Sequence, residues 1–106
     1  MDKTGWKTTT RKRHSAFIPL VEGGRIYPIN MWVRPKAGFG PLAVFADLDS
    51  ALKWAERLAL EMDIHPRRCE YKPSQSNAMW QSDQVKRPLK DAPPGTRLAC
   101  AIKCLE

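Results

Sequence analysis

The sequence predicts a small α+β domain, in which one main amphipathic helix packs on one face of a mostly antiparallel sheet of four or five strands. Two observations predict this class. Apolar residues recur every three to four positions over 48–62, and short runs of alternating polarity lie on either side of that segment. The chain has 106 residues, which fits a single domain with one modest core.

The segment before the helix predicts strands. Gly23-Gly24 separates two apolar runs, 17–21 and 25–33, and so predicts a β-hairpin over 15–34. In its second run, alternation would place Tyr27, Ile29, Met31 and Val33 on one face. A loop follows over 35–41, and 42–45 predicts a short buried strand.

The helix prediction rests on one apolar stripe and one cap. Asp47 is expected to be the N-cap, because a side-chain oxygen there accepts a backbone N–H of the first turn. Pro66 disfavours helix at the residue before it, so the helix is expected to end near Asp63. The stripe consists of Leu48, Ala51, Leu52, Ala55, Leu58, Ala59 and Met62.

Two further strands are predicted after the helix. The first spans 68–72, and the last spans 97–105 with Leu98, Cys100, Ile102 and Cys104 on one face. Between them, residues 73–96 are expected to be long and irregular, and loops of this length are usually functional or disordered.

Positive charge is concentrated at the start of the chain. The net charge is +7, and residues 1–13 hold five of the eighteen basic residues against one acidic residue. We therefore expect residues 1–14 to form a flexible basic arm and 15–106 to form the single α+β domain. In the arm, phosphates or bases would be contacted by Trp6, Lys7, Arg11, Lys12 and Arg13. The alternative is a solvated tail that aids solubility.

Two tryptophans outside the predicted core are the remaining binding candidates. Trp32 lies on the less apolar face of its strand, and Trp80 lies in the long polar loop together with Lys86, Arg87 and Lys90. Large aromatic residues are enriched in binding surfaces. The alternative is that each tryptophan covers a corner of a small core.

The cysteines and histidines do not form a recognisable site. Cys100 and Cys104 lie in one predicted strand, too far apart for one zinc ion, and all three thiols are expected to face inward. No nucleophile–base constellation or phosphate-binding glycine loop is visible. We therefore expect no metal, no cofactor and no enzymatic activity, with a small enzyme lacking a familiar motif as an alternative.

An odd number of cysteines, without a secretory signal or a long apolar segment, favours a reducing cytoplasm and no membrane contact.

Several short motifs, in order, resemble small proteins of unknown function encoded by phages and prophages. The resemblance covers residues 15–105, not the arm. The motifs are Trp32-Val33-x-Pro35, Gly40-Pro41-Leu42-x-Val44-Phe45, Ala51-x-x-Trp54-Ala55, Cys69-x-Tyr71-x-Pro73-Ser74 and Pro94-Gly95-Thr96-x-Leu98-Ala99. It implies no catalytic residue, but it implies a bacterial host, where such proteins act on host machinery, for example as anti-CRISPR inhibitors.

Two kinds of partner follow from these observations. The leading hypothesis is a non-enzymatic phage-type protein that inhibits or modulates a host nuclease or defence complex by blocking an acidic or hydrophobic protein surface. Its basic charge argues against mimicry of nucleic acid. The alternative is an accessory protein that binds nucleic acid through residues 1–13. The sequence leaves the oligomeric state open.

Overall fold

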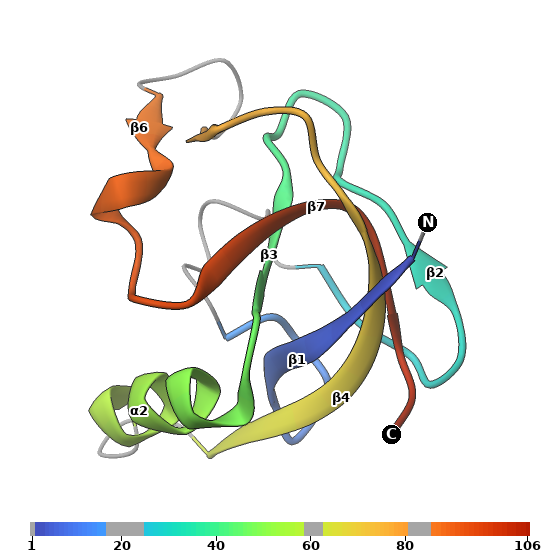
Figure 1. The fold of residues 1–106 in the computed structure, drawn as a ribbon. Helices are drawn as coiled ribbons and strands as arrows, with labels where there is room; N and C mark the ends of the chain where they lie inside the picture. Colours follow the sequence, from blue (N-terminus) through green and yellow to red (C-terminus); the bar gives the residue numbers. More distant parts are fainter. Residues whose placement is uncertain (1, 17–24, 59–62, 81–85) are drawn as a thin grey trace.

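The structure is a computed structural model that describes residues 2–16, 25–58, 63–80 and 86–106 (Figure 1). It has the expected α+β class, with one α-helix and a five-stranded antiparallel sheet among the described residues. In chain order the elements are β1 (Lys3–Thr10), β2 (Trp32–Val33), β3 (Leu42–Phe45), α2 (Leu48–Leu58), β4 (Ile64–Pro73), β5 (Ala78–Met79), β6 (Arg87–Pro88), the 3-10 helix η1 (Leu89–Asp91) and β7 (Thr96–Cys104).

The main sheet closes on itself. Its order is β2-β7-β3-β1-β4, and β4 pairs in turn with β7, so β1, β3, β7 and β4 form a ring of antiparallel strands. In Figure 1, β4 and β7 run side by side as the two long curved strands of this ring. The first half of β7 pairs with β3, and its second half lies between β2 and β4. Such closure leaves fewer free strand edges than an open sheet.

The core lies inside the ring. Its main cluster of buried side chains comes from four strands and the segment before β2: Tyr27, Val33, Leu42, Val44, Cys69, Tyr71, Ala99, Ile102 and Cys104. A second, smaller cluster covers the other face of β3 and β7, where Ala43 and Leu98 are opposite each other and Met79 covers them. Leu89 and Ala92 pack against this second cluster, which holds η1 to the sheet.

Cys100 is exposed, which corrects the expectation that all three thiols face inward. The pairing of β7 with β4 jumps from Ala101 opposite Lys72 to Ala99 opposite Pro73, so Cys100 is the extra residue of a β-bulge. A bulge shifts the alternation of side chains by one position. Strict alternation over 97–105 therefore predicts that Cys100 is buried, whereas the bulge turns it toward solvent.

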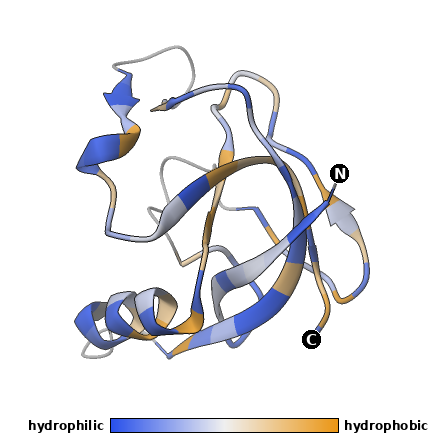
Figure 2. Cartoon of the chain, viewed as in Figure 1, coloured by the Kyte–Doolittle hydropathy of each residue, from blue (hydrophilic) through white to orange (hydrophobic). Residues whose placement is uncertain are grey.

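The expectation of a flexible arm is wrong for residues 3–10. They form β1, which pairs with β4 over its whole length and lies between β3 and β4 (Figure 1). Figure 2 shows why the sequence conceals this strand, since β1 is coloured in blue and pale tones although it lies within the sheet. Thr8 and Thr9 are buried there, and threonine is favoured in strands.

Lys7 is completely buried in the core. Its Nζ donates a hydrogen bond of 2.7 Å to Ala43 O and lies 4.9 Å from the centre of the Tyr27 ring. Burial of an amino group is costly unless it gains such partners. Lys7 therefore joins β1 to β3 across the interior of the ring.

The helix begins where the sequence predicts. Ser50 N donates to Asp47 Oδ1 at 2.8 Å, and this bond lowers the pKa of the Asp47 carboxyl from its ordinary value. The apolar stripe is only partly buried: Ala51 is fully covered, but Leu48 and Leu52 are exposed. Trp54 is half-buried, and its Nε1 donates to Ala16 O at 2.9 Å, which ties the helix to the segment after β1. The expected continuation over 59–62 lies outside the described residues.

The expected hairpin over 15–34 is only partly comparable, because its turn and the run 17–21 lie outside the described residues. Residues 13–15 pair with 25–27 through the bonds Ser15 N to Arg25 O and Tyr27 N to Arg13 O. The alternation predicted for 25–33 is wrong, because Asn30 has a positive φ of 60° and interrupts the strand. Tyr27 and Val33 are buried as expected, whereas the intervening apolar residues are exposed.

Within 73–96, the described residues are partly regular, since β5 pairs with β6 and η1 follows.

Candidate functional site

Most of the exposed large apolar side chains in the described part of the chain lie in one region. Residues 26–32 carry four of them, and Leu105 lies beside the same region, because Ile29 is bridged to Cys104 and Trp32 is opposite Lys103. We call the part of this region around Trp32 the Trp32 surface. It consists of Ile29, Met31, Trp32, Lys72, Lys103 and Leu105.

Trp32 is the centre of the Trp32 surface. β2 holds it at the edge of the sheet, where the residue is 36% exposed. Lys72 Nζ and Lys103 Nζ lie 5.0 and 5.2 Å from the ring centre. Both distances are within the range of a cation–π contact, so the two lysines restrict the ring without covering it.

Two carboxylates border the Trp32 surface. Glu70 Oε1 lies 3.2 Å from Lys103 Nζ, and Asp2 Oδ1 lies 4.0 Å from Lys72 Nζ. These half-exposed pairs are screened by solvent and contribute little to stability. The chain as a whole carries a net charge of +7, so its long-range field favours partners with an acidic face.

The structure separates the residues expected to act together in a basic arm. Lys7 is in the core, and Trp6 is half-buried in β1, opposite Phe45 on one side and Arg68 on the other. Lys7 therefore cannot contact a phosphate in this fold, which corrects its assignment as a binding residue. Trp6 lines a shallow cavity of about 230 Å³ together with Arg68 and residues 4, 5 and 46.

Arg13 also forms hydrogen bonds within the protein. Its Nε donates to Tyr27 O, and its Nη2 donates to Glu106 O at 2.6 Å. A positive φ of 71° at Arg13 marks the sharp turn between β1 and the residues that pair with 25–27. The arginine thus connects three separate segments of the chain.

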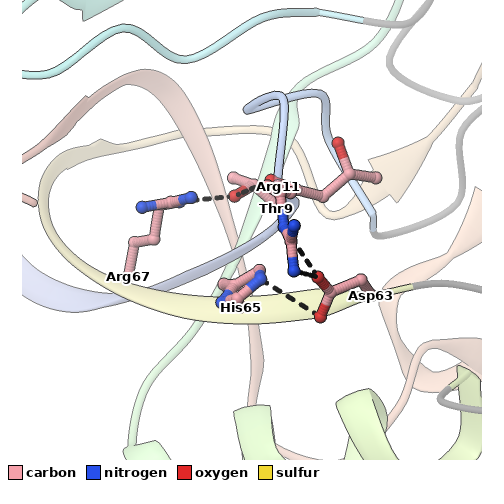
Figure 3. A network of polar contacts seen from close by, with 6 residues as sticks. Thr9, Arg11, Asp63, His65 and Arg67 are labelled. Carbon is pink, nitrogen blue, oxygen red and sulfur yellow. Dashed lines mark hydrogen bonds and ion pairs between the residues drawn. The ribbon is translucent and has the colours of Figure 1, made fainter.

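Arg11 belongs to a polar network at the end of β1 and the start of β4 (Figure 3). Its Nη2 lies 2.9 Å from Asp63 Oδ2, and His65 Nε2 lies 3.2 Å from Asp63 Oδ1. The contact with His65, followed by the nearby charges, lowers the pKa of the Asp63 carboxyl. In the same view Arg67 Nε donates to Thr9 Oγ1 at 2.6 Å. Lys12 is exposed beside this network.

Trp80 packs against the chain more closely than its loop position suggests. A Cβ added at Gly40 would lie 2.8 Å from the Trp80 ring, and Gly40 N donates to Trp80 O at 3.0 Å. Lys86 Nζ lies 5.2 Å from the centre of this ring. Arg87 in β6 and Lys90 in η1 are exposed nearby in sequence. Trp80 is therefore half-buried against Gly40, and the exposed Lys86 lies over its ring.

A cavity of about 240 Å³ lies between α2 and the loop before β7. Its lining includes the apolar residues Trp54, Pro93 and Pro94 and the basic residues Lys53 and Arg57. It is smaller than the ~300–1,000 Å³ of most ligand sites. Among the described residues, no three His, Cys, Asp or Glu side chains gather closely enough to hold a metal ion.

Sequence reasoning selected Trp32 but missed the two lysines on its ring. Lys72 and Lys103 each alternate outward on their predicted strands, and that signal was available. Their convergence depends on the β4–β7 register, which no local pattern contains.

In the described part of the chain, no helical segment has the length and apolar content that crossing a bilayer requires. Comparison of the whole chain with protein-family models, with curated proteins and with solved structures returns no match in any of the three.

Proposed function

We propose that this protein is a non-enzymatic, phage-type binding protein that inhibits or modulates a host nuclease or defence complex through protein–protein contacts. The observation that carries the proposal is the Trp32 surface, where an exposed tryptophan is held by two lysines among exposed apolar residues. Tryptophan is the residue type most often found at the energetic centre of an interface. The phage and host setting comes from the sequence resemblance alone.

The chemistry of the surface favours a particular kind of partner. Ile29, Met31 and Leu105 supply apolar area, which suits a protein face better than a phosphate backbone. The positive charge of the chain steers it toward an apolar site with an acidic rim. The Trp32 surface would inhibit its partner by covering such a site, and not by mimicking nucleic acid.

The test compares immobilised wild-type protein with Trp32→Ala and with a matched control, Leu52→Ala. Leu52 is an apolar residue on α2 that is 46% exposed, so it is at least as accessible as Trp32. A partner captured from nuclease-treated host lysate is purified and titrated by calorimetry against each protein. We expect Trp32→Ala to weaken binding by about 2 kcal/mol, or roughly 30-fold, and Leu52→Ala to leave it unchanged.

A second measurement tests the inhibition itself. If the captured partner is a nuclease or part of a defence complex, wild-type protein and Leu52→Ala should reduce its activity, and Trp32→Ala should not. Equal affinities for wild type and Trp32→Ala would contradict the proposed surface. Partner activity unaffected by saturating wild-type protein would contradict the inhibitory role.

Nucleic-acid binding remains a second candidate, and one observation favours it. A lysine lies over the ring of each of two partly exposed tryptophans, Lys72 over Trp32 and Lys86 over Trp80. Aromatic rings with nearby cations are typical of single-strand binding. Residues 3–10 no longer support it, because they are part of the sheet. This candidate predicts binding to DNA or RNA that falls steeply between about 50 and 200 mM salt.

A further inference from the structure

Cys69 and Cys104 are directly opposite each other on β4 and β7. The neighbouring pair, Arg68 and Leu105, is hydrogen-bonded, since Leu105 N donates to Arg68 O at 2.8 Å. Hydrogen-bonded and non-hydrogen-bonded pairs alternate along an antiparallel ladder, so the two cysteines form a non-hydrogen-bonded pair.

A second bond confirms this alternation. Cys104 O accepts a hydrogen bond of 2.7 Å from Asn30 N, which lies on the other side of β7 from β4. The backbone of Cys104 therefore points away from Cys69. In a non-hydrogen-bonded pair the Cα atoms are ~4.5 Å apart, which lies inside the ~4.4–6.8 Å range of disulfides.

Both thiols face the same enclosed space. Cys69 is 1% exposed and Cys104 is 0% exposed, and both belong to the main core cluster inside the ring. Burial, followed by the neighbouring Cys104, raises the pKa of the Cys69 thiol to about 12, and burial also raises the pKa of Cys104. In the closed ring the thiols are therefore protonated and slow to react.

We propose that Cys69 and Cys104 form a site of reversible oxidation, at which an intramolecular disulfide covalently closes the ring between β4 and β7. The position of the two residues opposite each other, in a non-hydrogen-bonded pair with both side chains inside the ring, carries this assignment. It does not depend on any partner of the Trp32 surface.

The oxidant is a small disulfide such as glutathione disulfide. Cys104 ends β7, so opening of that end exposes its thiol, which loses a proton and attacks one sulfur of the glutathione disulfide. One glutathione thiolate leaves and takes a proton. The Cys69 thiolate then attacks the mixed disulfide, and a second glutathione leaves as the thiol. The protein loses two protons and two electrons, which convert one glutathione disulfide into two glutathione molecules.

The third cysteine provides the internal control. Cys100 is exposed on the bulge and has no cysteine opposite it. The full chain carrying Cys100→Ser is therefore equilibrated with glutathione disulfide in low urea, which opens strand ends without unfolding the chain. Acid quenching, alkylation and intact-mass measurement then count the remaining thiols, and peptide mapping identifies the linked residues.

We expect Cys100→Ser protein to lose two hydrogens, to take up no alkylating agent, and to recover both thiols on reduction. The oxidised form should also unfold at a higher urea concentration than the reduced form. Adding Cys69→Ser or Cys104→Ser should abolish the mass loss and leave a glutathione adduct instead. The proposal is overturned if both thiols of Cys100→Ser are alkylated in the same low urea, yet oxidation gives only glutathione adducts or disulfide-linked dimers.

Discussion

The same contact, a lysine over an aromatic ring, occurs in two opposite environments of this protein. Lys7 lies over Tyr27 in the sealed interior, whereas Lys72 and Lys103 lie over Trp32 at the surface, and all three distances are near 5 Å. The buried contact excludes water and joins strands. The exposed contacts leave the ring open to another molecule. Whether a lysine–aromatic pair stabilises the fold or remains available for binding therefore depends on its burial, and not on the type of contact.

The largest expected effect is at the buried lysine. Lys7→Ala removes the hydrogen bond to Ala43 O and leaves a cavity, and we expect a loss of about 3–4 kcal/mol in the free energy of unfolding, measured by urea denaturation. Lys7→Met keeps most of the volume and should lose about 1–3 kcal/mol. Both losses should be insensitive to salt. If Lys7→Ala is as stable as the wild type, the buried contact does not stabilise the fold more than the exposed contacts do.

An intermediate effect is expected at the buried thiols at alkaline pH. The folded pKa of Cys69 is raised to about 12 from an ordinary 9.0, so its contribution is fully present below pH 9 and is lost as the pH rises toward 12. The free energy of unfolding of reduced protein should fall by on the order of 1 kcal/mol per pH unit from this group.

Cys69→Ala isolates this contribution, because other groups titrate in the same range. The variant is less stable at neutral pH, but its stability should depend less steeply on pH above 9. Cys100→Ala, at the exposed thiol, should keep the wild-type slope. Identical slopes in wild type and Cys69→Ala would contradict the raised pKa.

The smallest effect is expected at the surface. Lys103→Ala loses a contact with Trp32 and a half-exposed pair with Glu70, together about 0.5–1 kcal/mol at low salt. The loss should shrink at high salt, in contrast to Lys7→Ala. Urea denaturation of both variants at two salt concentrations measures the contrast directly. A larger, salt-independent loss would mean that Lys103 belongs with the interior.

The sequence predicted those elements whose determinants are local. Asp47 caps α2 through its own first turn, and the strand at 97–105 matches β7 closely. The prediction for β1 was wrong. Lys7 was assigned to a basic arm, and the hydrogen-bond acceptor that allows its burial, Ala43 O, is 36 positions away in the sequence. The exposure of Cys100 depends on a bulge in the register between two distant strands.

The candidate site was predictable to the same extent. Trp32 was selected because a large aromatic residue on a mostly polar face is unusual, a property of its own strand. Its lysines come from β4 and β7, so their meeting follows from closure of the ring. The residues assigned to a basic arm do not act together. Trp6 and Lys7 belong to β1, Arg11 contacts Asp63, and Arg13 donates to Tyr27 O and Glu106 O.

Because β7 pairs with β2, β3 and β4, the order of synthesis matters for this chain. While the ribosome is still translating residues before 96, the edges of β3 and β4 that β7 will occupy remain uncovered. Exposed strand edges of this kind attract other chains. Once residues 96–104 have left the exit tunnel, β7 can pair with these edges and close the sheet. The nascent chain is therefore most prone to aggregation before that step.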